Sequence, residues 1–461
     1  MIKRAQRTVS TLAVPAPLDQ AFDPMIVAMK AAREASTGGR LAIAWERESG
    51  GMARHDLALP SGWSDDRIFR LAERVVKFLR WCAGGYHLRV AGPEWVCRRL
   101  QEEYSEQGRR AFDADLMKKV YGRPLTVEVL PLAKMPQASD AAIAAGGHLD
   151  GYRLGFDLGA SDFKICAVDH GKVVFSDEFP WDPKNQPDPE YHYGRLNEGL
   201  RKAASFMPRV DAIGGSTAGV VVANRIMVAS LFRAVPPGHY ALAPGLFNRL
   251  QQEWQVPVEV ANDGDVTALA GALSLETKAI LGVAMGSSEA AGYFDRKGRL
   301  TGRLTELAFA PVDFNPASAA DEWSGDTGVG AMYFSQQAVN KLAPAAGITF
   351  DERLPLPERL KEVQQLMASG DQRARQIYET IGVYLGYTVP WYREFYDFDH
   401  LLILGRVTSG PGGEIILEKA HEVLKTEFPE LAGKVNVFMP DEKARRVGQS
   451  VAAASLPEVK S

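Results

Sequence analysis

Cysteine is scarce in this sequence, with only three residues in 461. Cys82, Cys97 and Cys166 lie far apart and show no paired metal-ligand spacing, which argues against both a disulfide framework and a structural zinc knuckle. Apolar runs are also short, and none approaches the roughly 20 residues that a membrane-spanning helix needs. We therefore expect a soluble, cytoplasmic protein with no membrane partner.

No charge of one sign dominates either. The chain has 53 Lys and Arg against 57 Asp and Glu, for a net charge of −4, which is too weak a field to attract nucleic acid. The Gly-x-x-x-x-Gly-Lys-Ser/Thr pattern of P-loop enzymes and the Gly-x-Ser-x-Gly elbow of hydrolases are both missing. Small molecules are therefore the expected partners.

What is present is a long folded chain: 46% hydrophobic and 24% charged residues suffice for two or three domains. After an arm of about 20 residues, alternating helix and strand patterns up to residue 130 predict an α/β unit. Residues 133–147 are rich in Ala, Gly, Ser and Pro, which is typical of a domain boundary. Two similar α/β lobes are then predicted, so the expected domains are residues 1–145, 146–270 and 271–461.

Three small-residue or acidic turns carry the candidate chemistry. The first, at residues 156–164 (Phe-Asp-Leu-Gly-Ala-Ser-Asp-Phe-Lys), joins two strands. Small residues let backbone N–H groups approach a phosphate, and Asp157 could hold a hydrated Mg²⁺. By itself the pattern also fits an ordinary Asx-rich hairpin turn.

The second motif, Asn262-Asp263, follows an apolar strand and precedes a helix. Its carboxylate could accept the proton of a sugar hydroxyl that attacks a γ-phosphate, although a simple helix cap has the same pattern. The third motif, residues 281–292, repeats the design of the first around Gly-Ser-Ser. Two phosphate-binding hairpins on separate lobes, with an acidic turn between them, would clamp ATP.

This order of motifs resembles the ROK family of sugar kinases, within the actin, hsp70 and hexokinase superfamily, over roughly two-thirds of the chain. The resemblance implies an α/β, two-lobed actin-like ATPase (ribonuclease H-like) fold that uses ATP and Mg²⁺. It implies that Asp263 is the general base. The implied sugar ligands are Asn262, Asp263, Glu306 and Gly215, and the implied phosphate or nucleotide contacts are Gly159, Ser161, Lys164, Gly286, Ser287, Ser288 and Gly405.

The sequence also departs from that family. Phe309 replaces a histidine that binds sugar and zinc, and residues 321–328 lack the family's cysteine cluster, so no zinc is expected. Glu289 would place an extra anion beside the phosphates and weaken nucleotide binding. Arg406 replaces a glycine in the adenosine turn, where it could block the base or stack on it. Trp323 could stack on a sugar or pack in a core.

Three functions stay open on the sequence. The first is ATP-dependent phosphorylation of a sugar or amino-sugar hydroxyl, the second is sugar or nucleotide sensing without turnover, and the third is DNA-binding regulation. ROK repressors carry an N-terminal helix-turn-helix, but residues 1–145 separate their helices by a predicted strand, which does not fit that motif. This unit could be a scaffold or a degenerate copy of a lobe. The oligomeric state, a homodimer included, is left open.

Overall fold

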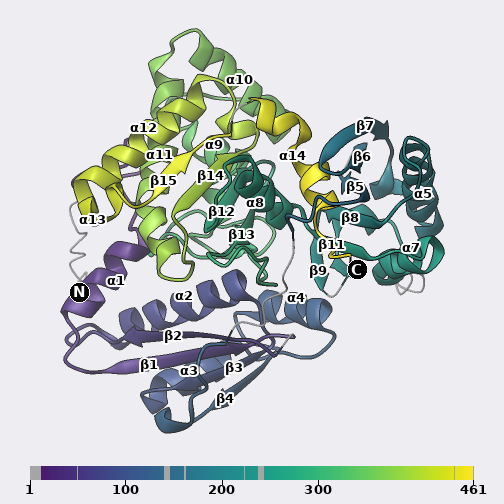
Figure 1. The fold of residues 1–461 in the computed structure, drawn as a ribbon. Helices are drawn as coiled ribbons and strands as arrows, with labels where there is room; N and C mark the ends of the chain where they lie inside the picture. The colour runs from purple at the N-terminus through teal and green to yellow at the C-terminus, as the bar shows by residue number, and fades with distance from the viewer. Residues whose placement is uncertain are drawn as a thin grey trace.

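The computed structural model describes residues 12–48, 50–139, 146–159, 162–222, 224–236, 243–440 and 442–459. Figure 1 shows two sheets with covering helices, one on each side of α8 and α14, and a third α/β unit formed by the N-terminal residues. No helix in these ranges is both long and apolar enough to cross a bilayer.

The N-terminal unit is built on a four-stranded sheet of order β2-β1-β3-β4. Helix α2 begins after Ser64 with two acidic residues in its first turn, and it ends at Gly84, whose φ of 79° a side chain would disfavour. The elements are α1 (Met25–Glu34), β1 (Arg40–Glu46), β2 (Met52–Ala58), α2 (Asp65–Ala83), β3 (His87–Ala91), α3 (Glu94–Glu103), α4 (Ala111–Tyr121) and β4 (Thr126–Val129).

The first lobe has a five-stranded sheet of order β11-β8-β5-β6-β7, in which β5, β8 and β11 are parallel and the β5-β6-β7 meander is antiparallel. Helices α5 and α7 lie beside it (Figure 1). The elements are β5 (Tyr152–Leu158), β6 (Asp162–Asp169), β7 (Lys172–Pro180), α5 (Pro189–Ala204), β8 (Ala212–Thr217), β9 (Val220–Val222), β10 (Arg225–Val228), α7 (Leu246–Trp254) and β11 (Val258–Asn262).

The second lobe repeats this topology as β13-β12-β14-β15, again with one antiparallel hairpin followed by parallel strands. Where the first lobe has the third meander strand, β7, the second lobe has a single bridge between Phe294 and Leu300. The elements are α8 (Asp263–Ser274), β12 (Ile280–Met285), β13 (Glu289–Phe294), α9 (Gln336–Leu342), α10 (Leu356–Ala368), α11 (Gln372–Arg393), β14 (His400–Leu404), α12 (Pro411–Glu427), α13 (Pro429–Ala432), β15 (Asn436–Phe438) and α14 (Glu442–Ala454).

The repeated strand order confirms the predicted fold class, a two-lobed actin-like ATPase fold with an added N-terminal α/β unit. The N-terminal sheet does not follow the same rule. Its β3 runs antiparallel to β1, whereas β8 and β14 run parallel to the first strands of their sheets. This strand direction argues against a degenerate copy of a lobe.

Three other features differ from the sequence-based expectations. The expected N-terminal arm is packed where it is described: Val14 and Ala16 are buried, and the Ala13 N–H donates to the Glu427 carboxylate at 2.6 Å. Strand β15 lies between the two final helices, where no strand was predicted. Helix α14, assigned by sequence to the second lobe, packs on β5 and β8 of the first sheet. Gly214 makes this approach possible, because a Cβ there would lie 1.7 Å from the Ala453 carbonyl oxygen.

One hydrophobic core joins the N-terminal unit to the second lobe. The Phe78 ring of α2 lies 4.8 Å from the Trp391 ring and 4.4 Å from the Phe395 ring, and the Trp81 ring lies 4.7 Å from the Phe309 ring. Burial of this much aromatic surface is the dominant stabilising term at such a contact. The N-terminal unit is therefore fixed on the second lobe and is not a tethered appendage.

A cluster of buried charges lies at the same contact. The Asp326 carboxylate forms ion pairs with Arg74 (2.9 Å), Lys77 (2.5 Å) and Arg110 (2.9 Å). Glu73 also pairs with Arg74 and Arg110. Burial alone would raise the pKa of Asp326, but the adjacent cations outweigh it and lower that pKa. Asp326 is thus the counter-charge that lets three cations stay out of water.

We expect Asp326→Asn to destabilise the protein by about 3–5 kcal/mol, because it leaves buried cations short of a partner. Asp115→Asn is the matched control, since it breaks the exposed pair with Lys119 in α4 and should cost less than about 1 kcal/mol. Urea unfolding of both variants measures the difference. Equal midpoints would show that the cluster contributes no more than a surface pair.

Candidate active site

The first two motifs meet at the carboxyl edge of the first sheet. Strands β5, β8 and β11 are parallel and in register, so Leu158, Thr217 and Asn262 stand side by side, and Asp157 stands one residue back beside Ser216. In open α/β sheets, ligands bind where parallel strands end. The strand pairing therefore brings together segments that are more than 100 residues apart in the sequence.

Asn262 fixes the turn from β11 into α8. Its Oδ1 accepts the Gly264 N–H at 2.8 Å, and its Nδ2 donates to the Gly219 carbonyl at 2.8 Å. The first bond is a helix N-cap, which fixes the backbone of the next residue, Asp263. Asn262, the predicted sugar ligand, therefore also caps α8 and positions Asp263.

Asp157 lies close enough to Asp263 to influence its ionisation. Burial, and then the negative charge of Asp157, raise the pKa of Asp263 to about 6. Burial also raises the pKa of Asp157, while the Ser216 hydroxyl and Lys164 oppose that rise. Two carboxyls in one poorly solvated place form an acid-base pair or a cation site.

Two hydrogen bonds of the Gly159 backbone hold the predicted first phosphate turn. The Gly159 N–H donates to the Asp162 carbonyl at 3.0 Å, and the Gly159 carbonyl accepts the Trp181 indole N–H at 2.9 Å. Lys164 is exposed and stands opposite Asp157 across the β5–β6 ladder. Ser161, also predicted to bind phosphate, lies outside the described residues.

The predicted second phosphate turn and the predicted adenosine turn lie together at the ends of β12 and β14. Ser287 and Ser288 are exposed, and the Gly286 N–H donates to the Ser288 carbonyl at 3.0 Å. Gly405 has a φ of 105°, and a Cβ there would lie 2.5 Å from the Met285 carbonyl oxygen. A glycine is therefore required where these two turns touch.

Glu289 is not the phosphate-facing anion that its sequence position suggested. Strand alternation turns it into the core, where it is 3% exposed and accepts a hydrogen bond from the Tyr392 hydroxyl at 3.0 Å. Burial, opposed in part by that hydroxyl, raises the pKa of Glu289 to about 8. The Glu289 carboxyl is therefore largely protonated at neutral pH and places no negative charge beside the predicted phosphate turn.

A cavity of about 450 Å³ adjoins the Asn262–Asp263 turn. Glu306 lines it, and burial, followed by the charges of Asp263 and Asp265, raises the pKa of Glu306 to about 7. The N-terminal unit, both lobes and the C-terminal segment supply the other lining residues. They are Arg47, Glu48, Tyr121, Val220, Val221, Val222, Asn224, Glu259, Val260, Ala261, Asn262, Asp265, Leu300, Gly302, Arg303, Leu304 and Leu456. The predicted sugar ligands Glu306 and Asn262 thus share one cavity.

Four residues singled out in the sequence lie apart from this cavity. Gly215 is buried under the ring of Phe156, where a Cβ would lie 2.1 Å from a ring carbon, so it serves strand packing. Phe309 is buried against Trp81. Trp323 is 68% exposed and packs its edge on Phe309, and the side chain of Arg406 is exposed.

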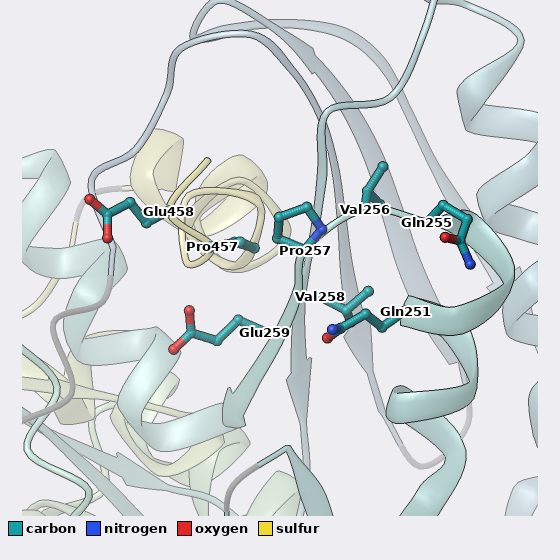
Figure 2. Close-up of a pocket in the computed structure, with 8 residues that line it drawn as sticks. All are labelled: Gln251, Gln255, Val256, Pro257, Val258, Glu259, Pro457 and Glu458. Carbon is teal, nitrogen blue, oxygen red and sulfur yellow. The ribbon is translucent and has the colours of Figure 1, made fainter. Parts of the chain in front are cut away.

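The sequence pattern did not single out Ser216 or Glu259, and it allowed Asp265 as the helix cap, a role that Asn262 has in the structure. Glu259 interrupts the apolar strand Val258–Val260, and this alternation was the signal that could have placed it on the cleft-facing side of β11. It also lines an open groove of about 530 Å³, in which Figure 2 shows Glu259 and Glu458 on the same side of β11. Burial raises the pKa of Glu259 to about 7.

Among the described residues, no group of three or more His, Cys, Asp or Glu side chains could hold a metal by protein ligands alone. A hydrated Mg²⁺ needs fewer protein ligands, because one or two carboxylates and the substrate phosphates suffice. Asp157, partly buried near the second carboxyl Asp263, fits that requirement.

Comparison with known proteins identifies the fold. No protein-family model matches the sequence, and a comparison with curated proteins finds no match. Among solved structures, a ROK hexokinase from Thermus thermophilus is 18% identical, with a TM-score of 0.51, over 66% of this chain and 97% of that one. A putative N-acetylmannosamine kinase from Listeria monocytogenes, Lmo2764, is 15% identical with a TM-score of 0.50 over 66% and 97% of the chains.

A ROK family transcriptional regulator, a homologue of the E. coli MLC protein, is also similar: 18% identity and a TM-score of 0.52 over 74% of this chain and 85% of that one. The chain therefore has the ROK sugar-kinase-like fold that its motifs predicted. At these identities the likeness concerns the fold, and kinases and a regulator share it.

Helix α8 is wedged against β13 through two glycines, which sets the position of Asp263 relative to the second lobe. A Cβ on Gly292 would lie 1.9 Å from the Gly264 carbonyl oxygen, and a Cβ on Gly264 would lie 2.1 Å from the Ala291 carbonyl oxygen. Both contacts involve backbone, which cannot rotate away. The first turn of α8 therefore has one permitted position on the second sheet.

We expect Gly292→Ala to lower the stability by about 1–3 kcal/mol, because the added methyl must push α8 off the sheet. Gly194→Ala is the matched control, since Gly194 lies in α5 with no atom within 4 Å of an added Cβ. That substitution should stabilise by about 0.5–1 kcal/mol. Thermal unfolding distinguishes the two, and equal shifts would contradict the wedge.

Proposed function

We propose that this protein transfers the γ-phosphate of ATP to a hydroxyl of a sugar or amino sugar, with Asp263 as the general base. The observation that carries the proposal is the position of Asp263, beside Asp157 at the carboxyl edge of the first sheet and next to the cavity that Glu306 lines. A base, a cation-holding carboxyl and a polar cavity are the parts that phosphoryl transfer to an alcohol requires.

Asp263 suits the role of base because its carboxyl has a pKa of about 6. It is deprotonated at neutral pH, yet it is a stronger base than an ordinary aspartate. The N-cap of Asn262 fixes its backbone, so little reorganisation is needed when a hydroxyl approaches. Glu306 and Asn262 would orient the sugar through hydrogen bonds.

The phosphate side would use the two small-residue turns. In this proposal the backbone and hydroxyl donors at Gly159, Ser161, Gly286, Ser287 and Ser288 bind phosphate oxygens, and Lys164 adds a positive charge. Asp157 would hold Mg²⁺ through water, and the ion would neutralise charge on the β- and γ-phosphates. Gly405 leaves room for the adenosine, and the exposed Arg406 is free to lie along the base.

Sugar sensing without turnover is the alternative, since a ROK regulator shares the fold. DNA binding by the N-terminal unit has less support. Its longest helix, α2, buries 14 of its 19 residues between its own sheet and the second lobe, so it has no free face for a DNA groove. The absence of a nucleic-acid partner, the absence of zinc and a cytoplasmic location stay predictions, and a homodimer stays open.

Asp263→Asn should reduce kcat for sugar phosphorylation by about 10²–10⁴-fold, because it removes the proton acceptor. In the wild type, kcat/KM should rise with pH through about 6, where Asp263 loses its proton, and then level off. A coupled assay for ADP across a panel of hexoses and amino sugars measures both.

Thermal unfolding and sugar-induced stabilisation of Asp263→Asn serve as controls for folding and binding. Full activity of this variant would rule out Asp263 as the base. Sugar-induced stabilisation of a wild type that never releases ADP would instead establish the sensor.

A further inference from the structure

The N-terminal unit contributes directly to the candidate ligand cavity. Three of its residues, Arg47 and Glu48 after β1 and Tyr121 at the end of α4, line the same cavity as Glu306 and Asn262. In Figure 1 this unit lies below both lobes, with α4 beside β9, and α4 contacts β10 of the first lobe. The unit thus forms a third wall, which the two-lobed fold alone does not supply.

The Glu306 segment is bonded to the end of α2. The Thr305 N–H donates to the Cys82 carbonyl at 3.1 Å, and the Glu306 N–H donates to the Trp81 carbonyl at 3.0 Å. Thr305 has a φ of 49°, a strained conformation for a β-branched residue. Because the last carbonyls of a helix need donors, these bonds satisfy α2 and hold the strained backbone that aims Glu306 at the cavity.

Tyr121 is tied to the same place. Its hydroxyl accepts the Gly85 N–H at 2.9 Å, and its ring lies 5.8 Å from the ring of Tyr86. A Cβ on Gly84 would lie 2.3 Å from the Tyr121 hydroxyl and 3.2 Å from Leu304, another cavity residue. The end of α2 therefore sets Tyr121 and the Leu304–Glu306 segment relative to each other.

The lining of the cavity is mixed in chemistry around Tyr121. Arg47, Glu48 and Arg303 supply charged groups, whereas Tyr121, Val220, Val221, Leu300 and Leu304 supply an apolar wall. The cavity volume of about 450 Å³ falls in the range of about 300–1,000 Å³ that sites for drug-sized ligands span. A hexose, with its twelve non-hydrogen atoms, is smaller than such ligands. A bare hexose would therefore leave space against the apolar wall.

We propose that Tyr121 is a specificity-determining residue, whose ring contacts an apolar substituent, such as an N-acyl group, on the bound sugar. The inference rests on the proposed function for the identity of the ligand as a sugar. Glu306 and Asn262 bind the sugar hydroxyls, and the Tyr121 ring packs on the substituent. Aromatic rings favour such contacts because they offer a flat apolar face at low entropic cost.

The test compares N-acetylglucosamine and N-acetylmannosamine with glucose and mannose as ligands for the full chain. Calorimetric Kd values without nucleotide are measured for the wild type, Tyr121→Ala, Tyr121→Leu and Tyr121→Phe. The wild type should bind an N-acetyl sugar more tightly than its parent hexose. Tyr121→Ala should weaken that binding about tenfold, the equivalent of roughly 1.4 kcal/mol, and should change hexose binding much less.

Tyr121→Phe keeps the ring but loses the hydroxyl that accepts the Gly85 N–H, so it should retain the preference. Comparing Tyr121→Phe with Tyr121→Ala distinguishes the effect of losing the aromatic ring from the effect of losing the hydrogen bond to Gly85. Tyr121→Leu keeps apolar volume at the site and should lose most of the preference if the flat ring is what matters. Thermal unfolding of each variant reports folding.

The proposal is overturned if the wild type prefers the bare hexose or binds none of the four sugars. It is also overturned if Tyr121→Ala weakens both classes equally. Calorimetry reports binding and not phosphotransfer, so the two proposals can fail separately. A retained preference in a protein that never releases ADP supports the role of Tyr121 and refutes the kinase. Turnover with an unchanged preference in Tyr121→Ala does the reverse.

Discussion

The structure depends on the single backbone turn by which β11 leaves the first sheet and becomes α8. The side chain of Asn262 caps the helix and bonds to Gly219, and the next turn lies against β13 at a distance that only glycine allows. This turn joins the two lobes and presents Asp263 to the site. Any change in how α8 lies on β13 is therefore a change in where the candidate base lies.

The N-terminal unit extends that arrangement. The end of α2 binds the backbone of Thr305 and Glu306, its cations surround Asp326, and its aromatic residues share a core with α11. Residues 321–328 lack the cysteine cluster that the resemblance to the ROK family would imply. In this chain, packing and ion pairs from α2 hold the same segment. An added domain has thus become part of the site's support.

The carboxyl groups in the cleft have raised pKa values mainly because they are buried, although Arg47 and Arg303 also line the cavity. Asp263, Asp265, Glu259 and Glu306 all have raised pKa values, and burial is the leading cause for each. Such groups can accept protons from hydroxyls or donate hydrogen bonds to them near neutral pH. Glu289 shows the contrasting case, since its raised pKa comes with a buried tyrosine partner and no access to the cleft.

The sequence by itself determined the lobed fold and the motif residues Asp157, Asn262 and Asp263, because strand and helix periodicity and small-residue turns are local signals. It could not show that Gly215 serves strand packing or that Glu289 points into the core. The direction of each depends on which strand or helix lies beside it, and that is decided only when distant segments pack. The role of residues 12–139 was equally hidden. Only the tertiary structure brings Tyr121 to the cavity and the end of α2 to Glu306, since those contacts join segments roughly 100 residues or more apart in the sequence.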